Sequence, residues 1–167
     1  GNSIGESNNE KTLNYFTHTI YYGIIISIFI TYIGLNYADD IFNIMGTSAE
    51  VKSLGLEYTD VIFSGSVIFI LVVCLNSLLH AEGDTKTYRN LLILSFFLNI
   101  LLNPIFIFGF LFIPAMGVKG LAVATIISQF ISLIIIFFKI LNNSRVKQIS
   151  VNYFRPKLIY FKNLFFQ

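Results

Sequence analysis

Three polar side chains, Ser95, Asn99 and Asn103, recur every fourth residue in an otherwise apolar stretch of the sequence. On an α-helix, residues four apart lie on the same face. Pro104 follows directly and has no backbone N–H, so the carbonyl of Ile100 lacks its helical donor. Such a row in an apolar setting must face protein or water. It therefore either lines a cavity that hydrogen-bonds a solute or ion, or it hydrogen-bonds a neighbouring helix.

Other ionisable residues lie near the ends of apolar runs, where structural roles are expected. His18 fits a proton relay or, as we expect, an interfacial position that reaches water. Asp60 precedes the charge-free run 61–81 and fits a cation site or, as we expect, a helix N-terminus, together with Glu57. Asp39 and Asp40 are adjacent and would not face each other on a helix, so we expect them to cap a short helix.

The composition places the chain among membrane proteins. Of its 167 residues, 55% are hydrophobic and only 12% are charged, about half the charged share of a soluble domain. Cys74 is the single cysteine, which excludes an internal disulfide and a cysteine-rich metal site. The formal net charge of +2 is too small to indicate nucleic-acid binding. The sequence has no catalytic Ser/His/Asp, Cys/His or paired-carboxylate pattern, so neither an enzyme nor a cofactor is expected.

Four long stretches lack Asp, Glu, Lys and Arg, namely 12–38, 61–81, 90–118 and 120–138. A membrane-spanning helix needs about 17–25 apolar residues. The sequence therefore predicts an all-α, polytopic membrane helix bundle with four transmembrane helices. The transmembrane region is 1–141, with spans at about 13–36, 57–80, 88–110 and 118–140, and a basic cytoplasmic linker follows at 142–167.

Local signals refine the ends of these spans and their packing. A short surface helix is expected to end at Gly46, and Asp84 or Thr87 is expected to cap the third span. The fourth span carries a small residue at every fourth position: Gly120, Ala124, Ser128 and Ser132. Small residues allow a second helix to approach closely, so this stripe predicts helix packing.

The positions of Lys and Arg predict the orientation in the membrane. With four spans, nine of the 11 basic residues lie at the two ends or in the loop 82–90, and only Lys52 and Lys119 lie on the other side. Basic residues gather on the cytoplasmic side of membrane proteins. Both ends of the segment are therefore predicted to be cytoplasmic, in the cell (plasma) membrane.

Three motifs, in this order and spacing, resemble the MATE (multidrug and toxic compound extrusion) transporter family. The sequence 83–87 (Gly-Asp-Thr-Lys-Thr) resembles the loop between that family's fourth and fifth helices. The sequence 98–104 (Leu-Asn-Ile-Leu-Leu-Asn-Pro) resembles its fifth helix. The sequence 117–125, with Ser128 and Gln129, resembles the opening of its sixth. By this resemblance, the chain is expected to hold spans three to six of twelve, from the amino-terminal half.

The resemblance implies a function and a site. Some family members carry an Asn and, four residues later, an Asp on the fifth span, with a Thr from the sixth. Here Asn99 matches the Asn, Asn103 stands in place of the Asp, and Thr125 matches the Thr. Because an amide cannot take up a proton, the departure at 103 argues against a proton carrier there. Ser95, Asn99, Asn103 and Thr125 are therefore the candidates to line a substrate or ion cavity.

The implied function is export of organic, often cationic, compounds in exchange for Na+ or H+. The implied partners are a small-molecule substrate, the lipid bilayer and the remaining helices of the transporter, with no nucleic acid. Two alternatives stay open. One is a lipid-linked sugar flippase of the wider superfamily, which would more often show charged residues facing the cavity. The other is a self-contained four-helix membrane protein with a structural role.

Overall fold

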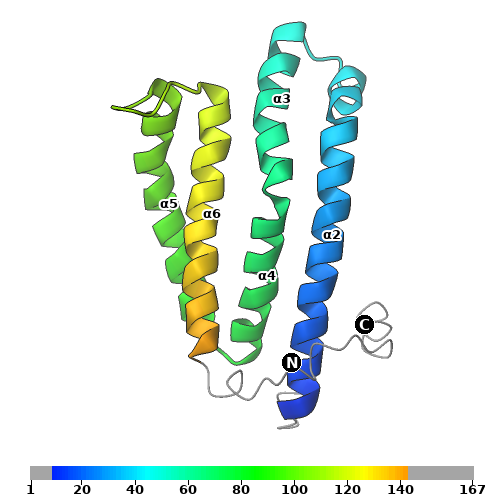
Figure 1. Ribbon diagram of the computed structural model, residues 1–167, viewed down its shortest axis with the longest axis vertical. Helices are drawn as coiled ribbons and strands as arrows, with labels where there is room; N and C mark the ends of the chain where they lie inside the picture. The colour runs from blue at the N-terminus through cyan, green and yellow to red at the C-terminus, as the bar shows by residue number, and fades with distance from the viewer. Residues whose placement is uncertain (1–8, 143–167) are drawn as a thin grey trace.

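The computed structural model describes residues 9–142, and in this part of the chain helices are joined by short turns and, between α5 and α6, by the loop 109–117 (Figure 1). The helices are α2 (Asn9–Ile44), α3 (Ala49–Ser64), α4 (Ser66–Ala81), α5 (Thr85–Phe108) and α6 (Val118–Leu141). Helices α3 and α4 stack end to end between α2 and α6, and α5 packs on the far side of α6 (Figure 1). The predicted all-α helix bundle is confirmed.

Three of these helices, α2, α5 and α6, are long and apolar enough to cross a membrane. Helices α3 and α4 meet the same test together, as a pair bent by 49°. The described part of the chain therefore offers up to four spans. Large apolar side chains such as Phe96 and Phe97 on α5 stay more than half exposed, which fits a surface that lipid covers.

Helix α2 is longer than the sequence predicted. The first span was expected to end near residue 36 and a separate short helix to follow, but α2 continues to Ile44. Asp39 and Asp40 therefore lie inside a helix, and the prediction that they cap one is wrong. No Gly or Pro interrupts 35–45, so nothing stops the helix before Gly46, whose φ of +66° forms the turn.

Helix α3 begins at Ala49, eight residues before the predicted start of the second span. Ser48 is its N-cap, and its side chain accepts a hydrogen bond from the backbone N–H of Val51. Glu57 and Asp60 consequently lie within α3, and the prediction that they open this span is wrong. The helical path breaks instead at Gly65, where α3 ends and α4 begins.

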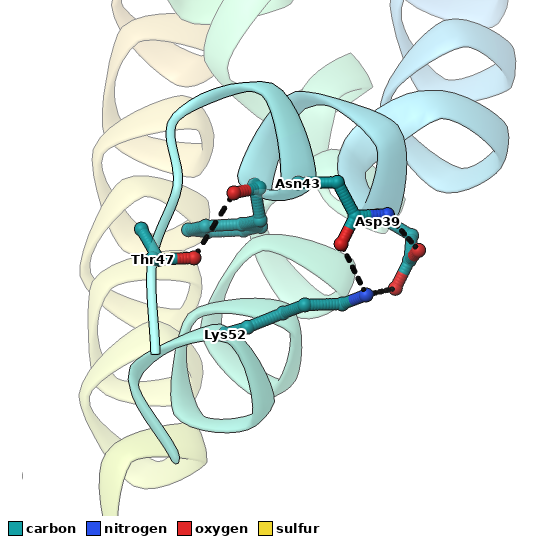
Figure 2. Close-up of polar contacts among 5 residues, drawn as sticks. Asp39, Asn43, Thr47 and Lys52 are labelled. Carbon is teal, nitrogen blue, oxygen red and sulfur yellow. Dashed lines mark hydrogen bonds and ion pairs between the residues drawn. The ribbon is translucent and has the colours of Figure 1, made fainter. Parts of the chain in front are cut away.

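A polar clamp ties α2 to α3 beside their connecting turn (Figure 2). The Lys52 ammonium lies 2.6 Å from the Asp39 carboxylate and donates to Asn43 Oδ1 at 2.8 Å. Asn43 Nδ2 in turn donates to Asp39 at 2.9 Å, so the three side chains form a closed triangle. Thr47 Oγ1 donates to the backbone carbonyl of Phe42 and holds the turn itself (Figure 2).

The opposite end of the bundle is fixed by Asp84, which caps α5 as the sequence predicted. Its carboxylate accepts hydrogen bonds from the backbone N–H and the hydroxyl of Thr87. The Lys139 ammonium at the end of α6 lies 3.4 Å from the same carboxylate. The hydrogen bonds from Thr87, and then Lys139, hold the pKa of Asp84 below its ordinary value. One residue thus starts α5 and links it to α6.

The buried apolar core lies in the half of the bundle that contains this Asp84 end. Its members come from α2, α4, α5 and α6: Phe16, Val72, Leu75, Leu78, Leu79, Leu91, Ile136 and Ile140. The predicted small-residue stripe on α6 is buried at Gly120, Ala124, Ser128 and Ser132. A Cβ at Gly120 would lie 2.5 Å from the backbone oxygen of Phe106, so the backbones of α5 and α6 touch there.

Candidate functional site

The predicted polar row begins at Ser95, which is buried between α5 and α6. Its hydroxyl lies 3.0 Å from the hydroxyl of Ser132, and either group can donate. Ser132 Oγ also lies within hydrogen-bonding distance of the backbone carbonyl of Ser128. Ser95 therefore has a partner on the neighbouring helix, which supports the helix-packing interpretation for this member of the row.

Asn99 and Thr125, predicted from different motifs, lie in contact. The Asn99 amide Nδ2 donates to the backbone carbonyl of Ser95 at 2.8 Å. Thr125 Oγ1 lies 3.3 Å from Asn99 Oδ1 and 2.9 Å from the backbone carbonyl of Leu121. Because a hydroxyl carries one proton, these two acceptors compete for it, and the shorter contact is to Leu121. Asn99 Oδ1 therefore keeps most of its capacity to accept or coordinate.

Asn103 completes the row and is the least satisfied of its members. Its Oδ1 is buried and has no hydrogen-bond partner within residues 9–142. Pro104 lies inside α5, so the carbonyl of Ile100 receives no helical hydrogen bond from position 104. Asn99 and Asn103 are one turn apart on one face. This turn of α5 thus combines amide oxygens with a backbone oxygen that lacks its usual donor.

A further residue of this kind, Asn76 on α4, was missed by the sequence analysis. Its side chain is 8% exposed, and its Oδ1 also has no hydrogen-bond partner in the described part of the chain. A buried amide oxygen without a donor costs free energy, so it calls for a ligand, a water or another helix. The signal in the sequence was an amide inside the charge-free run 61–81.

His18 does not lie at the surface as predicted, because its side chain is fully buried. Its Nδ1 lies 2.7 Å from the backbone carbonyl of Asn14. A carbonyl only accepts, so Nδ1 carries the proton of this hydrogen bond. The prediction that His18 reaches water from an interface is wrong for this structure. Within residues 9–142, no group of three His, Cys, Asp or Glu side chains is arranged to hold a metal ion.

The MatE family profile matches residues 1–105 of the sequence, which is more than half of the chain. The chain belongs to the MATE (MatE) family. Among curated relatives, the "Probable multidrug resistance protein NorM" of Thermotoga maritima is 34% identical over 131 residues. The "Multidrug export protein MepA" of Staphylococcus aureus is 28% identical over 153 residues. These relatives are transporters rather than enzymes.

A MATE transporter solved in an inward-facing conformation has a similar structure, with a TM-score of 0.86 and 29% sequence identity. The superposition covers 98% of this chain and 36% of that one. An outward-facing MATE structure gives a TM-score of 0.82 at the same identity. The chain spans 28% of the T. maritima relative and 33% of the S. aureus relative, although 78% and 92% of its own length is matched. It is thus a multi-pass membrane segment with the MATE fold.

Proposed function

We propose that this chain forms part of a secondary active multidrug exporter. Its substrates would be organic, often cationic, compounds, and inward movement of Na+ or H+ would drive their export. The observation that carries this proposal is the half-buried Asn99–Thr125 contact, with the Asn103 Oδ1, which has no hydrogen-bond partner within residues 9–142, one turn further along α5. The names of the relatives, multidrug resistance and multidrug export proteins, support the substrate class.

The polar row would act through its oxygens. Asn99 Oδ1 holds only a long, shared hydrogen bond, and Asn103 Oδ1 holds none within residues 9–142. Amide and backbone carbonyl oxygens in an interrupted helix are suited to coordinate a small cation or to accept from a substrate. Since amides do not titrate, the row would bind Na+ or substrate. Coupling to H+ would require an acid outside it.

The structure adds Asn76 on α4 as a further buried amide besides the four predicted residues. Helix α4 packs against α5 and α6, the helices that carry the row. The buried Oδ1 of Asn76 has no hydrogen-bond donor within residues 9–142, so it needs a partner as Asn103 Oδ1 does. Asn76 lies about 20 Å nearer the Asp84 end of the bundle than Asn103 by helix rise, so we propose it as a separate polar site on α4 and keep Asn99, Asn103 and Thr125 as the candidates for the cavity.

The orientation would place both ends of the segment in the cytoplasm. The start of α2, the turn before α5 and the end of α6 lie at one end of the bundle (Figure 1). Lys52 lies beside the α2–α3 turn and Lys119 at the start of α6, both at the other end. This distribution of basic residues supports the positive-inside assignment. The predicted linker 142–167 lies outside the described residues except for Asn142.

Transport would need the remaining helices of the exporter, since the matched relatives are about three times as long. The fold of this segment resembles both an inward-facing and an outward-facing MATE structure. That likeness supports a mechanism in which the segment moves largely as one body, and access alternates by rocking against the other half.

The test is ion-driven efflux of ethidium in inverted vesicles that contain the exporter in which this segment lies. We expect Asn99→Ala and Asn103→Ala to reduce efflux at normal expression, and Asn36→Ala, at an exposed position on α2, to leave it unchanged. Equal efflux by the wild type and all three variants would show that the row serves only helix packing. If the exporter moves no organic cation under a Na+ or an H+ gradient, the proposed export activity is refuted.

A further inference from the structure

The loop 109–117, which joins α5 to α6, folds into a tight turn. The backbone N–H of Phe110 donates to the carbonyl of Ile113 at 3.0 Å, and the N–H of Ile113 donates back to Phe110 at 2.9 Å. This exchange of two hydrogen bonds closes a two-residue hairpin turn. At its base, Gly109 has a φ of +79° and no room for a side chain against the returning arm of the loop. We call residues 110–113 the apolar tip.

The apolar tip presents large hydrophobic side chains on its outside. Phe112 is 98% exposed, Leu111 is 82% exposed and Phe110 is 58% exposed. The whole loop lies within the charge-free run 90–118, so no charged side chain of its own favours a position in water. Large apolar side chains that gather on an exposed surface mark an interaction site. The tip therefore needs a partner that residues 9–142 do not supply.

The backbone at Leu111 supports this need for a partner. Its φ is +51°, and among residues 9–142 no other residue except glycine has a positive φ. This conformation costs free energy for a bulky side chain, and tight hairpin turns usually place Gly, Asn or Asp in it. In water the exposed Leu111 side chain recovers none of that cost. Transfer of the side chain from water to an apolar medium would offset it.

The level of the tip follows from two lysines on α6. Lys119 and Lys139 flank the charge-free run 120–138. At 1.5 Å per residue they lie about 30 Å apart along the helix, which matches the thickness of the hydrocarbon core of a bilayer. Lysines at the ends of a span reach the boundary between membrane and water. The loop ends at Gly117, next to the start of α6, so the apolar tip lies at this boundary.

The direction of the loop also fits the boundary. In Figure 1 it extends sideways beyond α5, on the side away from α6 and the other helices. The α2–α3 turn, at the same end of the bundle, rises above the loop and carries the charged clamp of Asp39 and Lys52 (Figure 1). The charged turn thus extends further out, toward water, whereas the apolar one lies along the membrane surface.

We propose that the apolar tip is an interfacial anchor, which inserts Phe110, Leu111 and Phe112 among lipids at the boundary between headgroups and acyl chains. At this depth the acyl chains cover the side chains, and headgroups and water still hydrogen-bond to the backbone of the turn. Because the tip carries no charge, it requires no anionic lipid. The anchor holds the end of the α5–α6 hairpin, next to the contact between Gly120 and Phe106, at a fixed depth.

The experiment measures the accessibility of nitroxide labels by electron paramagnetic resonance. The exporter in which this segment lies, in a Cys74→Ser background, is reconstituted into phosphatidylcholine nanodiscs. A label at Phe112→Cys is compared with one at Glu50→Cys, an exposed position beside the α2–α3 turn. Oxygen concentrates in lipid, whereas a water-soluble nickel chelate stays outside it. We expect the ratio of oxygen to chelate collisions to be several-fold higher at Phe112→Cys than at Glu50→Cys.

A second variant tests whether the side chains themselves set the depth. Phe110→Ser with Leu111→Asn makes the tip polar, and Asn tolerates the positive φ of the turn. We expect this change to lower the ratio at Phe112→Cys by about twofold or more, because less apolar surface enters the lipid. The ratio at Glu50→Cys should stay the same, which shows that the fold is intact. An unchanged ratio at Phe112→Cys would overturn the role of the side chains as an anchor.

The label at Phe112→Cys also separates lipid from the other possible surroundings of the tip. Collision mainly with the chelate would place the tip in water. Collision with neither reagent would place it against other helices of the exporter. Either result would overturn the proposal. No ion gradient is present, so the result does not depend on whether the exporter moves an organic cation.

Discussion

Substituting Gly120 by Ala should separate the two helices that carry the polar row. The added Cβ would lie 2.5 Å from Phe106 O, 2.6 Å from Phe106 C and 3.0 Å from Ile107 N. All three are backbone atoms of α5, so no side-chain rotation relieves the overlap. The helices must move apart by about 0.5–1 Å to restore ordinary contact distances.

The cost follows from this overlap. Overpacking a well-packed contact costs about 1–3 kcal/mol, and Ala recovers up to about 1 kcal/mol because it is a better helix former than Gly. Because the overlap is with backbone atoms, we take the upper part of that range, about 2–3 kcal/mol, and expect a net loss of about 1–2 kcal/mol in the free energy of unfolding. The Thr125–Asn99 contact, already 3.3 Å, should lengthen beyond hydrogen-bonding distance.

The matched control is Gly65→Ala, the same substitution at the junction of α3 and α4. There the new Cβ would meet the tip of the Ile126 side chain, which can change rotamer. The assay is unfolding of the purified chain in mixed micelles by SDS titration, followed by circular dichroism. We expect Gly65→Ala to lose less stability than Gly120→Ala. Equal stability of Gly120→Ala and the wild type would refute the close backbone approach of α5 and α6.

Substitutions at Asp84 and at the Lys52–Asp39 pair test the two ends of the bundle by the same unfolding assay. Asp84→Ala should cost about 1 kcal/mol because it removes the N-cap of α5, whereas Asp84→Asn should keep the cap and lose only the pairing with Lys139. Because folding lowers the pKa of Asp84, its contribution is complete above the ordinary carboxyl pKa of about 3.9. The gap between wild type and Asp84→Ala should therefore close as the pH falls through the lowered value, and a gap independent of pH would contradict this. Lys52→Asp should loosen the α2–α3 turn through repulsion from Asp39, and adding Asp39→Lys should restore much of the loss; no restoration would count against the clamp.

Hydropathy and short-range signals were sufficient for much of the fold. Helix α6 begins at Val118, where its span was predicted, and Asp84 caps α5 as expected. The spacing of Ser95, Asn99 and Asn103 predicted that they share one helix face. The resemblance to the MATE family predicted that Thr125 joins Asn99, and the two side chains are in contact. Their role in binding remains a prediction.

The remainder depended on packing that no local pattern contains. Charged residues mark where hydropathy falls, not where a helix ends, so α2 continued past Asp39 and α3 began before Glu57. The break at Gly65 lies where the chain approaches Ile126 on α6, which is far away in sequence. The sequence does not show that Asn76 is buried with an Oδ1 that has no hydrogen-bond partner within residues 9–142.

The central claim is that the row on α5 faces an aqueous cavity, and thiol accessibility tests it most directly. In a Cys74→Ser background, which removes the single native thiol, Asn103→Cys is compared with Phe97→Cys on α5. The two positions are 120° apart on the helix, and Phe97 lies among the side chains that lipid should cover. In the membrane-embedded exporter, a water-soluble maleimide should label Asn103→Cys and spare Phe97→Cys, since the thiolate forms only where water reaches. Labelling of Phe97→Cys alone, or of neither variant, would contradict the cavity.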